Sequence, residues 1–393
     1  MAIEISVNPH FSRPNWAHID LDALRHNAQT LAHIVAPARL IAVVKAGAYG
    51  HGAVEISRVL QKMKEVEMLA VSSVDEARLL RKNEITAPIL LFGALLPEEA
   101  SEVVQLGLTP TVWTPEIARA LSDAARNDAA SNDAVRNCRR LPVHFKVDTG
   151  MHRLGANRCE AARAFKEIAA TENLEIAAVY THFACADEGF GQCEDFSALQ
   201  LRRFERFCTE AEVPDSTLKH AANSAGALRF EAARFDLVRP GLALYGAHPC
   251  QNLAPDVELR PVMTWHARVT ALKKVARGEG VSYGQIWRAA RDCRIAVVPA
   301  GYADGYQRSL SNVGEVLVGG KMAPVIGRVT MDQILVDVTD IEAQIGDIVT
   351  LWGEGLAVET VAARAGTIAY ELLCGVSSRV PRVYRGDCLA AES

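Results

Sequence analysis

Short apolar runs alternate with amphipathic stretches along the first two thirds of the chain, from Leu40 to Gly246. Eight runs carry this pattern: Leu40–Val44, Met68–Val71, Pro88–Phe92, Thr109–Val112, Val143–Val147, Ile176–His182, Leu218–Ala221 and Leu237–Leu244. Strands that alternate with helices favour parallel pairing, because each helix returns the chain to the same edge of the sheet. Eight such units match the size and rhythm of a closed (β/α)8 barrel.

The pattern changes after Ala247, where β-type runs follow one another with Gly-containing connections. The predicted strands are Thr264–Val275, Ile295–Val298, Glu315–Val318, Ala323–Val329, Ile334–Val338 and Asp347–Trp352. Gly319 and Gly320 lie between two of them and predict a hairpin turn rather than a phosphate loop, since the Walker spacing is absent. We therefore expect a barrel over residues 14–247 and a mainly β domain over 248–393, joined by an N-terminal strand within 1–13.

Composition narrows the class of protein. The 393 residues are 49% hydrophobic and 23% charged, with a formal net charge of -5, which argues against disorder and against a nucleic-acid partner. The Ala, Asn and Asp residues between Arg119 and Arg140 predict a helix that ends in a surface loop. The N-terminus carries charged residues and prolines instead of an apolar signal core, and no apolar run is long enough to span a membrane. We expect a cytoplasmic protein.

Nine cysteines are scattered along the chain without a C-x-x-C pair, which predicts neither a disulfide framework nor a zinc site. Cys185 and Cys193 flank an acidic stretch near His182. Isolated cysteines are more often small buried hydrophobic residues than metal ligands, so we expect no metal.

Lys45 follows the first predicted barrel strand directly, in the segment Ile41-Ala-Val-Val-Lys45-Ala-Gly-Ala-Tyr49-Gly-His-Gly52. Catalytic groups of barrels lie at the carboxyl ends of the strands. A partly desolvated lysine there favours the neutral amine that forms Schiff bases. A surface lysine that ends a strand is the common alternative, and spacing alone leaves both open.

Further polar motifs follow later runs. They are Lys146-Val-Asp-Thr-Gly-Met-His-Arg153, Thr-His182-Phe-Ala, Asn223-Ser224, Arg239-Pro-Gly241-Leu242 and Val281-Ser-Tyr283-Gly. Each residue has an ordinary structural interpretation: a serine that caps a helix, a glycine in a turn, a buried tyrosine, or an ion pair between Arg239 and Asp236.

Together with Lys45 these motifs resemble the alanine racemase family over most of the chain. The family usually has Asp or Asn where this chain has Gly47, which removes a side-chain hydrogen bond near the lysine. The resemblance implies that Lys45 holds pyridoxal 5'-phosphate and acts as base on one face of the substrate. It also implies further cofactor contacts from Tyr49, Arg153, His182, Asn223, Ser224, Arg239, Gly241, Leu242 and Tyr370.

The resemblance gives two of these residues defined tasks. Arg239 faces the pyridine nitrogen, and an arginine there keeps that nitrogen unprotonated, so the ring withdraws electrons less strongly. Arg153 binds the phenolic oxygen of the cofactor and the carboxylate of the substrate, a task that suits a planar guanidinium. Lys146 is frequently carbamylated in the family, and an unmodified lysine is the alternative.

Racemisation needs a second acid or base on the opposite face of the α-carbon. The resemblance assigns this role to Tyr283 of the other subunit, with Met331 and Asp332, and makes His182 the neighbour that links it to Arg239. A phenol is a weak base at neutral pH unless nearby positive charge stabilises the phenolate. The implied assembly is a head-to-tail homodimer with shared active sites.

Other positions match the narrow corridor that leads into the family's site: Asp187, Tyr302, Arg308, Ile368 and Ala369. Bulky neighbours there favour alanine as substrate, with serine as a poor one. A broad-specificity racemase, a pyridoxal-phosphate-dependent decarboxylase, a cofactor carrier and a cofactor-free lysine aldolase remain alternatives, because a fold does not fix a function. Sequence does not decide between D-alanine biosynthesis for peptidoglycan and alanine catabolism.

Overall fold

The computed structural model describes residues 13–131, 140–188, 192–250, 253–254 and 256–386. The chain divides into two compact units. One comprises Leu24–Arg260, and the other combines the residues up to Ala23 with those from Pro261 onward. The boundaries predicted at residues 14 and 247/248 remain predictions. The strand expected within 1–13 lies outside the described residues, apart from Arg13.

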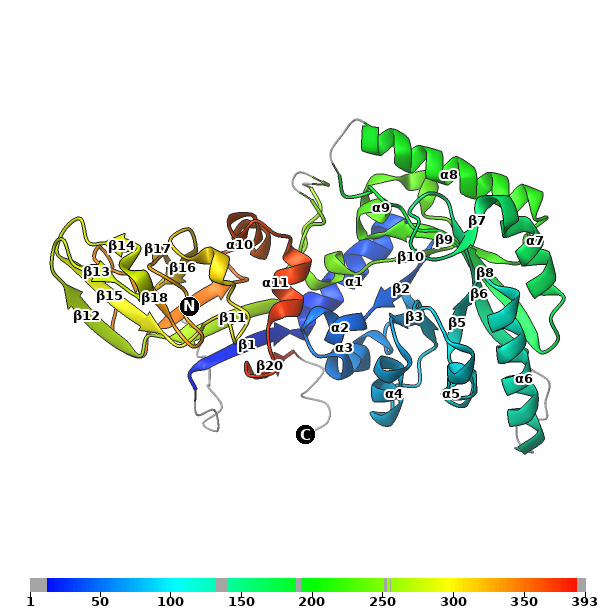
Figure 1. The fold of residues 1–393 in the computed structure, drawn as a ribbon, viewed down its shortest axis with the longest axis horizontal. Helices are drawn as coiled ribbons and strands as arrows, with labels where there is room; N and C mark the ends of the chain where they lie inside the picture. The colour runs from blue at the N-terminus through cyan, green and yellow to red at the C-terminus, as the bar shows by residue number, and fades with distance from the viewer. Residues whose placement is uncertain (1–12, 132–139, 189–191, 251–252, 255, 387–393) are drawn as a thin grey trace. The chain divides into compact units, whose positions relative to one another are not determined.

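The first unit is a closed barrel of eight parallel strands (Figure 1). They are β2 (Arg39–Val43), β3 (Val66–Val71), β4 (Ile89–Leu91), β5 (Thr109–Val112), β6 (Leu141–Asp148), β8 (Leu174–Tyr180), β9 (Leu218–Asn223) and β10 (Leu237–Arg239). The barrel closes because β10 pairs in parallel with β2. All eight predicted runs contain a strand, and the predicted fold is confirmed.

The barrel strands are almost continuously buried, as expected for a parallel sheet covered on both faces. Every residue of β4 and β5 is buried. The last predicted run, Leu237–Leu244, is wrong in its second half: β10 ends at Arg239 because Pro240 and Gly241 interrupt it, and Leu242–Tyr245 form a 3-10 turn.

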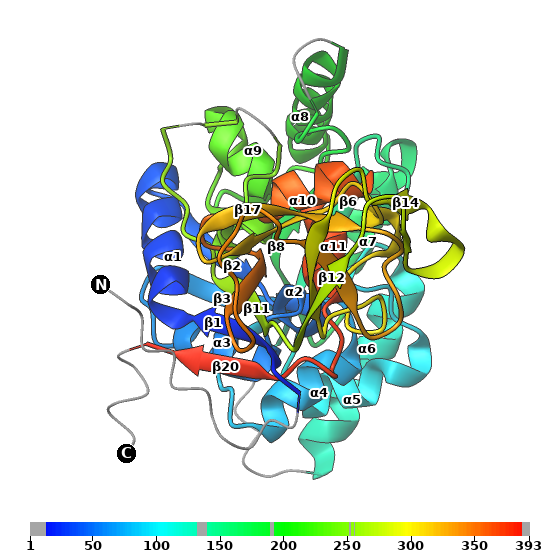
Figure 2. The ribbon, with the colours of Figure 1, turned by 90° about the vertical axis from the view of Figure 1, so that its left-hand side faces the viewer.

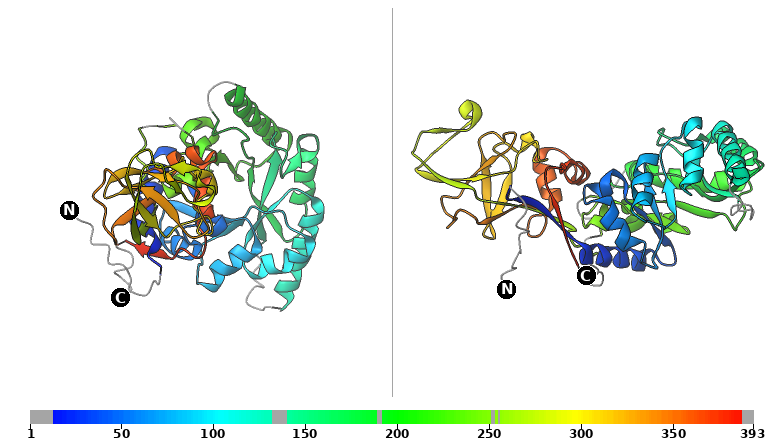
Figure 3. Two further views of the ribbon diagram at one scale, coloured as in Figure 1. Left: turned by 60° about the vertical axis from the view of Figure 1, so that its left-hand side comes forward. Right: turned by 90° about the horizontal axis from the view of Figure 1, so that it is seen from below.

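Helices cover the outside of the barrel (Figure 3, left). They are α1 (Leu21–Val35), α3 (Ala53–Leu60), α4 (Val74–Lys82), α5 (Ala100–Gln105), α6 (Pro115–Ser131), α7 (Arg158–Ala169) and α8 (Gln192–Glu210), with the shorter α2 (Lys45–Tyr49) and α9 (Ser224–Arg229) at strand ends. The helix predicted near Arg119 is α6, and most of its expected loop lies outside the described residues. A two-residue strand, β7 (Ala156–Asn157), pairs in parallel with the end of β6.

The second unit is built on a nine-stranded sheet, several strands of which are labelled in Figure 2. Its order is β12-β15-β18-β17-β16-β19-β11-β1-β20. The strands are β1 (Asn15–Asp20), β11 (Met263–Arg268), β12 (Ala271–Val275), β15 (Cys293–Val298), β16 (Glu315–Val318), β17 (Lys321–Ile326), β18 (Ile334–Asp337), β19 (Ile348–Trp352) and β20 (Arg382–Arg385). The hairpin of β13 (Gly280–Val281) and β14 (Trp287–Arg288) and the helices α10 (Val358–Ala365) and α11 (Ala369–Gly375) complete it.

Two details of this unit bear on the predictions. Gly319 and Gly320 have φ of 56° and 77° and join β16 to β17, so the predicted hairpin turn is confirmed. The predicted run Thr264–Val275 is two strands rather than one, because the chain leaves β11 after Arg268 and pairs next with β15.

No helix within the described part of the chain is long and apolar enough to cross a membrane. Among the same residues, no group of three or more His, Cys, Asp or Glu side chains is arranged to hold a metal ion.

Candidate active site

Lys45 lies at the carboxyl end of the first barrel strand, two residues after β2 ends. The four residues that follow it, Ala46–Tyr49, all have positive φ between 53° and 63°. Backbone hydrogen bonds close this left-handed turn, from the Ala48 N–H to the Val44 carbonyl at 2.9 Å and from the Gly50 N–H to the Ala46 carbonyl at 3.0 Å. The lysine is half-buried at the barrel rim.

A polar cradle forms where β9 and β10 end. The buried Ser224 hydroxyl oxygen accepts the backbone N–H groups of Gly241 at 2.9 Å and Ala243 at 3.2 Å. The Tyr49 hydroxyl lies so close to Gly241 that a Cβ at that position would be 2.3 Å from it, so only glycine fits. The Asn223 side chain caps α9 by accepting the Gly226 N–H at 2.9 Å. Two hydroxyls and a backbone amide therefore converge beside the lysine-bearing turn.

Arg239, the last residue of β10, is fully buried. Its Nη2 donates to the carbonyls of Thr181 and Ala221, both at 2.8 Å. Its Nη1 lies 2.6 Å from Nδ1 of His220. Burial lowers the pKa of Arg239 to about 10, so the guanidinium remains charged at neutral pH. Asp236, the alternative partner weighed from the sequence, instead accepts the Lys219 N–H at 2.7 Å.

The charge of Arg239 fixes the protonation of three histidines, of which His144 and His220 are buried and His182 is half-buried. Since a guanidinium only donates, Nδ1 of His220 accepts, and its Nε2 carries the proton and donates to Nδ1 of His144 at 3.0 Å. Nδ1 of His182 likewise accepts from Nη2 of Arg239 at 3.1 Å, which leaves the proton of His182 on Nε2. Burial lowers the pKa of all three rings, that of His144 to about 3, so they are neutral.

Lys146 on β6 is also buried, 5.3 Å above the ring of Tyr180. Burial lowers the pKa of Lys146 to about 7. Three neighbouring cations contribute to this shift, against the opposing effect of Asp148: Arg239, Arg153 and Lys45. The same four cations act on His182, so this end of the barrel concentrates positive charge. Such a site suits an anionic ligand.

The remaining predicted residues of the barrel unit lie in loops. Arg153 is exposed in the loop after β6, and Asp187 is half-buried in the loop after β8. Leu242 is buried at the start of the 3-10 turn after Gly241. The structure thus brings Lys45, Lys146, Arg153, His182 and Arg239 within electrostatic reach of one another.

The other predicted residues belong to the second unit, which is described by itself. Tyr283 is 73% exposed, in a tight turn where Ser282, Gly284 and Gln285 have positive φ. Met331 is 52% exposed and Ile368 is 61% exposed. Asp332 is exposed as well, whereas Ala369 is buried and Tyr370 half-buried on α11. Tyr302 and Arg308 line a common open hollow of about 460 Å³.

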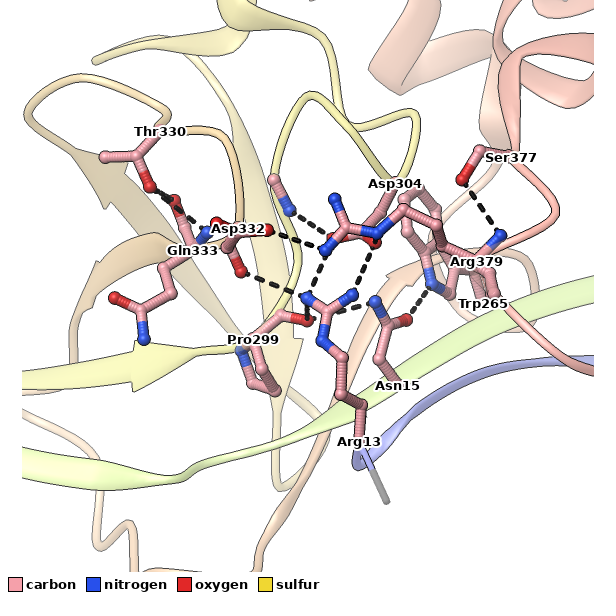
Figure 4. A network of polar contacts seen from close by, with 12 residues as sticks. Arg13, Asn15, Trp265, Pro299, Asp304, Thr330, Asp332, Gln333, Ser377 and Arg379 are labelled. Carbon is pink, nitrogen blue, oxygen red and sulfur yellow. Dashed lines mark hydrogen bonds and ion pairs between the residues drawn. The ribbon is translucent and has the colours of Figure 1, made fainter. Parts of the chain in front are cut away.

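A buried carboxylate organises the loops that carry Tyr302 and Met331 (Figure 4). Asp304 is fully buried, accepts the Gly301 N–H at 3.0 Å and pairs with Arg13 at 2.7 Å. Arg379 lies 3.6 Å from Asp304 and 2.6 Å from the Asp332 carboxylate. The backbone completes the arrangement, since the Tyr302 N–H donates to the Thr330 carbonyl at 3.0 Å. One charged network therefore holds both loops.

Comparison with known proteins identifies the family. The sequence profile of the alanine racemase N-terminal domain matches residues 19–249, and that of the alanine racemase C-terminal domain matches residues 262–384. The chain belongs to the alanine racemase family. The predicted family is therefore confirmed, and membership makes the chain an enzyme of the isomerase class.

Full-length relatives agree with this assignment. An alanine racemase of Symbiobacterium thermophilum is 40% identical over 382 residues, which cover 95% of this chain and 98% of the relative. A solved alanine racemase of Clostridium difficile has a TM-score of 0.85 at 36% identity, covering 95% and 96% of the two chains. The Bartonella henselae enzyme, solved with covalently bound pyridoxal phosphate, has a TM-score of 0.84 at 31% identity, covering 95% and 99%.

Sequence reasoning missed several residues that surround Arg239 in the barrel. His144 and His220 extend from Arg239 into the barrel, and Tyr180 stacks on His220 with ring centroids 4.5 Å apart. All three are polar or amphipathic side chains within otherwise apolar strands. That interruption of the apolar pattern was the available signal, because a buried polar group needs a partner.

Proposed function

We propose that this enzyme interconverts L- and D-alanine with pyridoxal 5'-phosphate as cofactor, in the cytoplasm. The observation that carries the proposal is the concentration of cations around His182, beside the cradle of Tyr49, Ser224 and Gly241. Bound there, the cofactor would supply an electron-withdrawing ring that acidifies the α-proton of an amino acid. The free thiols of Cys159, Cys208, Cys250 and Cys293 suit a reducing compartment.

The donor set fits the cofactor's functional groups. Lys45 offers an amine for covalent attachment. The hydroxyls of Tyr49 and Ser224 and the amide of Leu242 would offer donors for phosphate oxygens. The Gly241 amide, which donates to Ser224, lies beside them, Asn223 fixes the start of α9, and Tyr370 would add a hydroxyl. Within the described residues the hydrogen bonds of Arg239 run from its two Nη atoms, to His220, Thr181 and Ala221, and not from Nε. That N–H would donate to the ring nitrogen of the bound cofactor, which would then stay unprotonated.

Lys45 and Tyr283 are the proposed acid and base, one on each face of the substrate. The Lys45 amine takes or returns the α-proton on its side. The Tyr283 oxygen, contributed by the partner subunit of a homodimer, does the same on the other. His182, neutral with its proton on Nε2, is a suitable donor to a phenolate. The exposure of Tyr283 and Met331 supports a surface that a second copy covers.

Arg153 is proposed to bind the substrate carboxylate, with Met331 beside it. A carbamate on Lys146 would orient that guanidinium by supplying the negative charge this cationic cluster lacks. The lowered pKa of Lys146 supports this modification, because only the neutral amine attacks carbon dioxide. Tyr302, Arg308, Asp187, Ile368 and Ala369 are proposed to line the corridor into the site.

A broad-specificity racemase is the second candidate, because Gly47 leaves open space next to the lysine-bearing turn. A decarboxylase is less well supported by the family. Chiral separation of products tests all three: cofactor-loaded protein is incubated with L-alanine, L-serine or L-lysine, with Lys45→Ala as control. Conversion of L-alanine to D-alanine that vanishes in the control supports the proposal, and carbon dioxide release without racemisation contradicts it.

A further inference from the structure

The turn that carries Lys45 is conformationally costly. Ala46, Ala48 and Tyr49 adopt left-handed φ of 53°, 55° and 54°. For residues other than glycine this conformation costs about 1–2 kcal/mol each, because the Cβ approaches the following carbonyl oxygen. A run of such residues persists only where surrounding contacts hold it.

One side chain outside the turn contacts its first residue. The Ala46 N–H, which follows Lys45 directly, donates to Oε1 of Glu76 at 2.7 Å. The other carboxylate oxygen, Oε2, accepts the Ser72 N–H at 2.7 Å and lies 3.0 Å from the Ser72 hydroxyl. Ser72 follows β3 and Ala46 lies shortly after β2, so Glu76 ties together the ends of two adjacent barrel strands.

Capping of the helix in which Glu76 lies does not explain the hydrogen bonds of its side chain. Ser73 caps α4 by accepting the Glu76 N–H at 3.3 Å, which is half of a capping box. In the complete motif the glutamate side chain would return to the backbone N–H of the capping residue itself. Here both carboxylate oxygens are used by Ser72 and Ala46 instead. The side chain therefore serves the lysine-bearing turn as well as the helix.

We propose that Glu76 is a positioning residue for Lys45: by holding the Ala46 amide, it fixes the first residue of the left-handed turn and so the direction in which the lysine leaves the strand. The inference rests on the proposed role of Lys45. Glu76 need not touch substrate or cofactor, and its effect passes through the backbone.

The test compares Glu76→Gln and Glu76→Ala with Asp75→Asn as matched control. Asp75 lies in the same turn of α4 and pairs with Arg78, so its substitution removes a charge at the same place without reaching Ala46. The first readout is the rate at which apoprotein captures pyridoxal phosphate, followed by absorbance and assigned to Lys45 by borohydride reduction and peptide mass. The second is hydrogen exchange of the 45–52 segment.

Glu76→Gln is expected to slow capture at least fivefold and to speed exchange of the segment at least tenfold, while the KM for alanine stays within twofold. Glu76→Ala should slow capture and speed exchange more strongly. In Asp75→Asn both rates should stay within twofold of wild type. If the capture and exchange rates of Glu76→Gln match those of Asp75→Asn, the inference about Glu76 is overturned while the proposed function stands. Failure of the wild-type protein to capture the cofactor at Lys45 would overturn the proposed function and this inference with it.

Discussion

At position 47 the sequence predicts a departure from the Asp or Asn that is usual in the family, and the backbone conformation of Gly47 determines which side chains fit there. Gly47 has a φ of 63°, and a Cβ built there would meet no atom within 4 Å. The position therefore has room for a side chain and is limited only by its left-handed conformation. Asparagine tolerates that conformation far better than β-branched residues do.

We expect Gly47→Asn to change the free energy of unfolding by less than about 1 kcal/mol, since the gain from a less flexible unfolded chain offsets the remaining strain. Gly47→Val should lose about 2 kcal/mol. Urea titration of the two variants checks this. Equal stability of Gly47→Val and wild type would show that the turn is not left-handed in solution.

The lowered pKa of Lys146 predicts that the stability of the folded protein depends on pH. Its pKa is about 7 in the folded protein, against an ordinary value of 10.5. Between these values the unfolded chain binds one proton more than the folded chain, so this residue makes stability rise with pH across that window. The penalty for burying the charged lysine is fully present below about pH 7.

Lys146→Met should therefore stabilise the protein most at pH 6, with the advantage shrinking toward pH 10. Unfolding titrations in buffers free of carbon dioxide measure the difference, and Lys62→Met supplies a comparison at an exposed lysine outside the cationic cluster. A difference between Lys146→Met and wild type that does not vary with pH would contradict the burial of a charged amine. In bicarbonate labelled with carbon-13, wild type should add a carbamate signal that the variant lacks.

At the scale of elements, the loops that carry Tyr302 and Met331 depend on Asp304. Replacing its carboxylate by an amide leaves Arg13 and Arg379 without their common counter-ion. Both arginines are partly exposed, so solvent screens part of the loss, and we expect Asp304→Asn to cost about 2–4 kcal/mol.

Asp340→Asn is the matched control, because its pair with Arg291 is exposed on both sides and should contribute less than about 1 kcal/mol. Thermal unfolding followed at the tryptophans compares the two variants. A loss for Asp304→Asn no larger than that of the control would show that the network does not hold these loops.

The barrel strands could largely be predicted from the sequence, because the apolar runs that fill a parallel barrel recur regularly along the chain. All eight barrel strands were predicted, whereas the break after Arg239 was not, because Leu242–Leu244 continue the apolar pattern across Pro240 and Gly241. The individual site residues stand out by motif and resemblance. Contacts such as those of Glu76 with Ala46 or of His220 with His144 join segments that are distant in the sequence, so no local sequence pattern predicts them.

At the scale of the whole molecule, the proposed active site needs two subunits. Lys45→Ala and Tyr283→Ala homodimers should each be nearly inactive. After subunit exchange, a mixed dimer contains one site that has both Lys45 and Tyr283, so mixing should restore up to about one quarter of wild-type activity when heterodimers form statistically. Absence of rescue, with heterodimers verified by mass, would contradict the shared site.

The central claim is that protons exchange on both faces of one α-carbon. The most direct measurement follows L-alanine and D-alanine separately in D₂O with cofactor-loaded protein, by chiral separation and mass analysis at early times. The account predicts that each enantiomer yields its mirror image carrying α-deuterium, and that Lys45→Ala abolishes this exchange. Recovery of unlabelled L-alanine from folded, cofactor-loaded protein would contradict it.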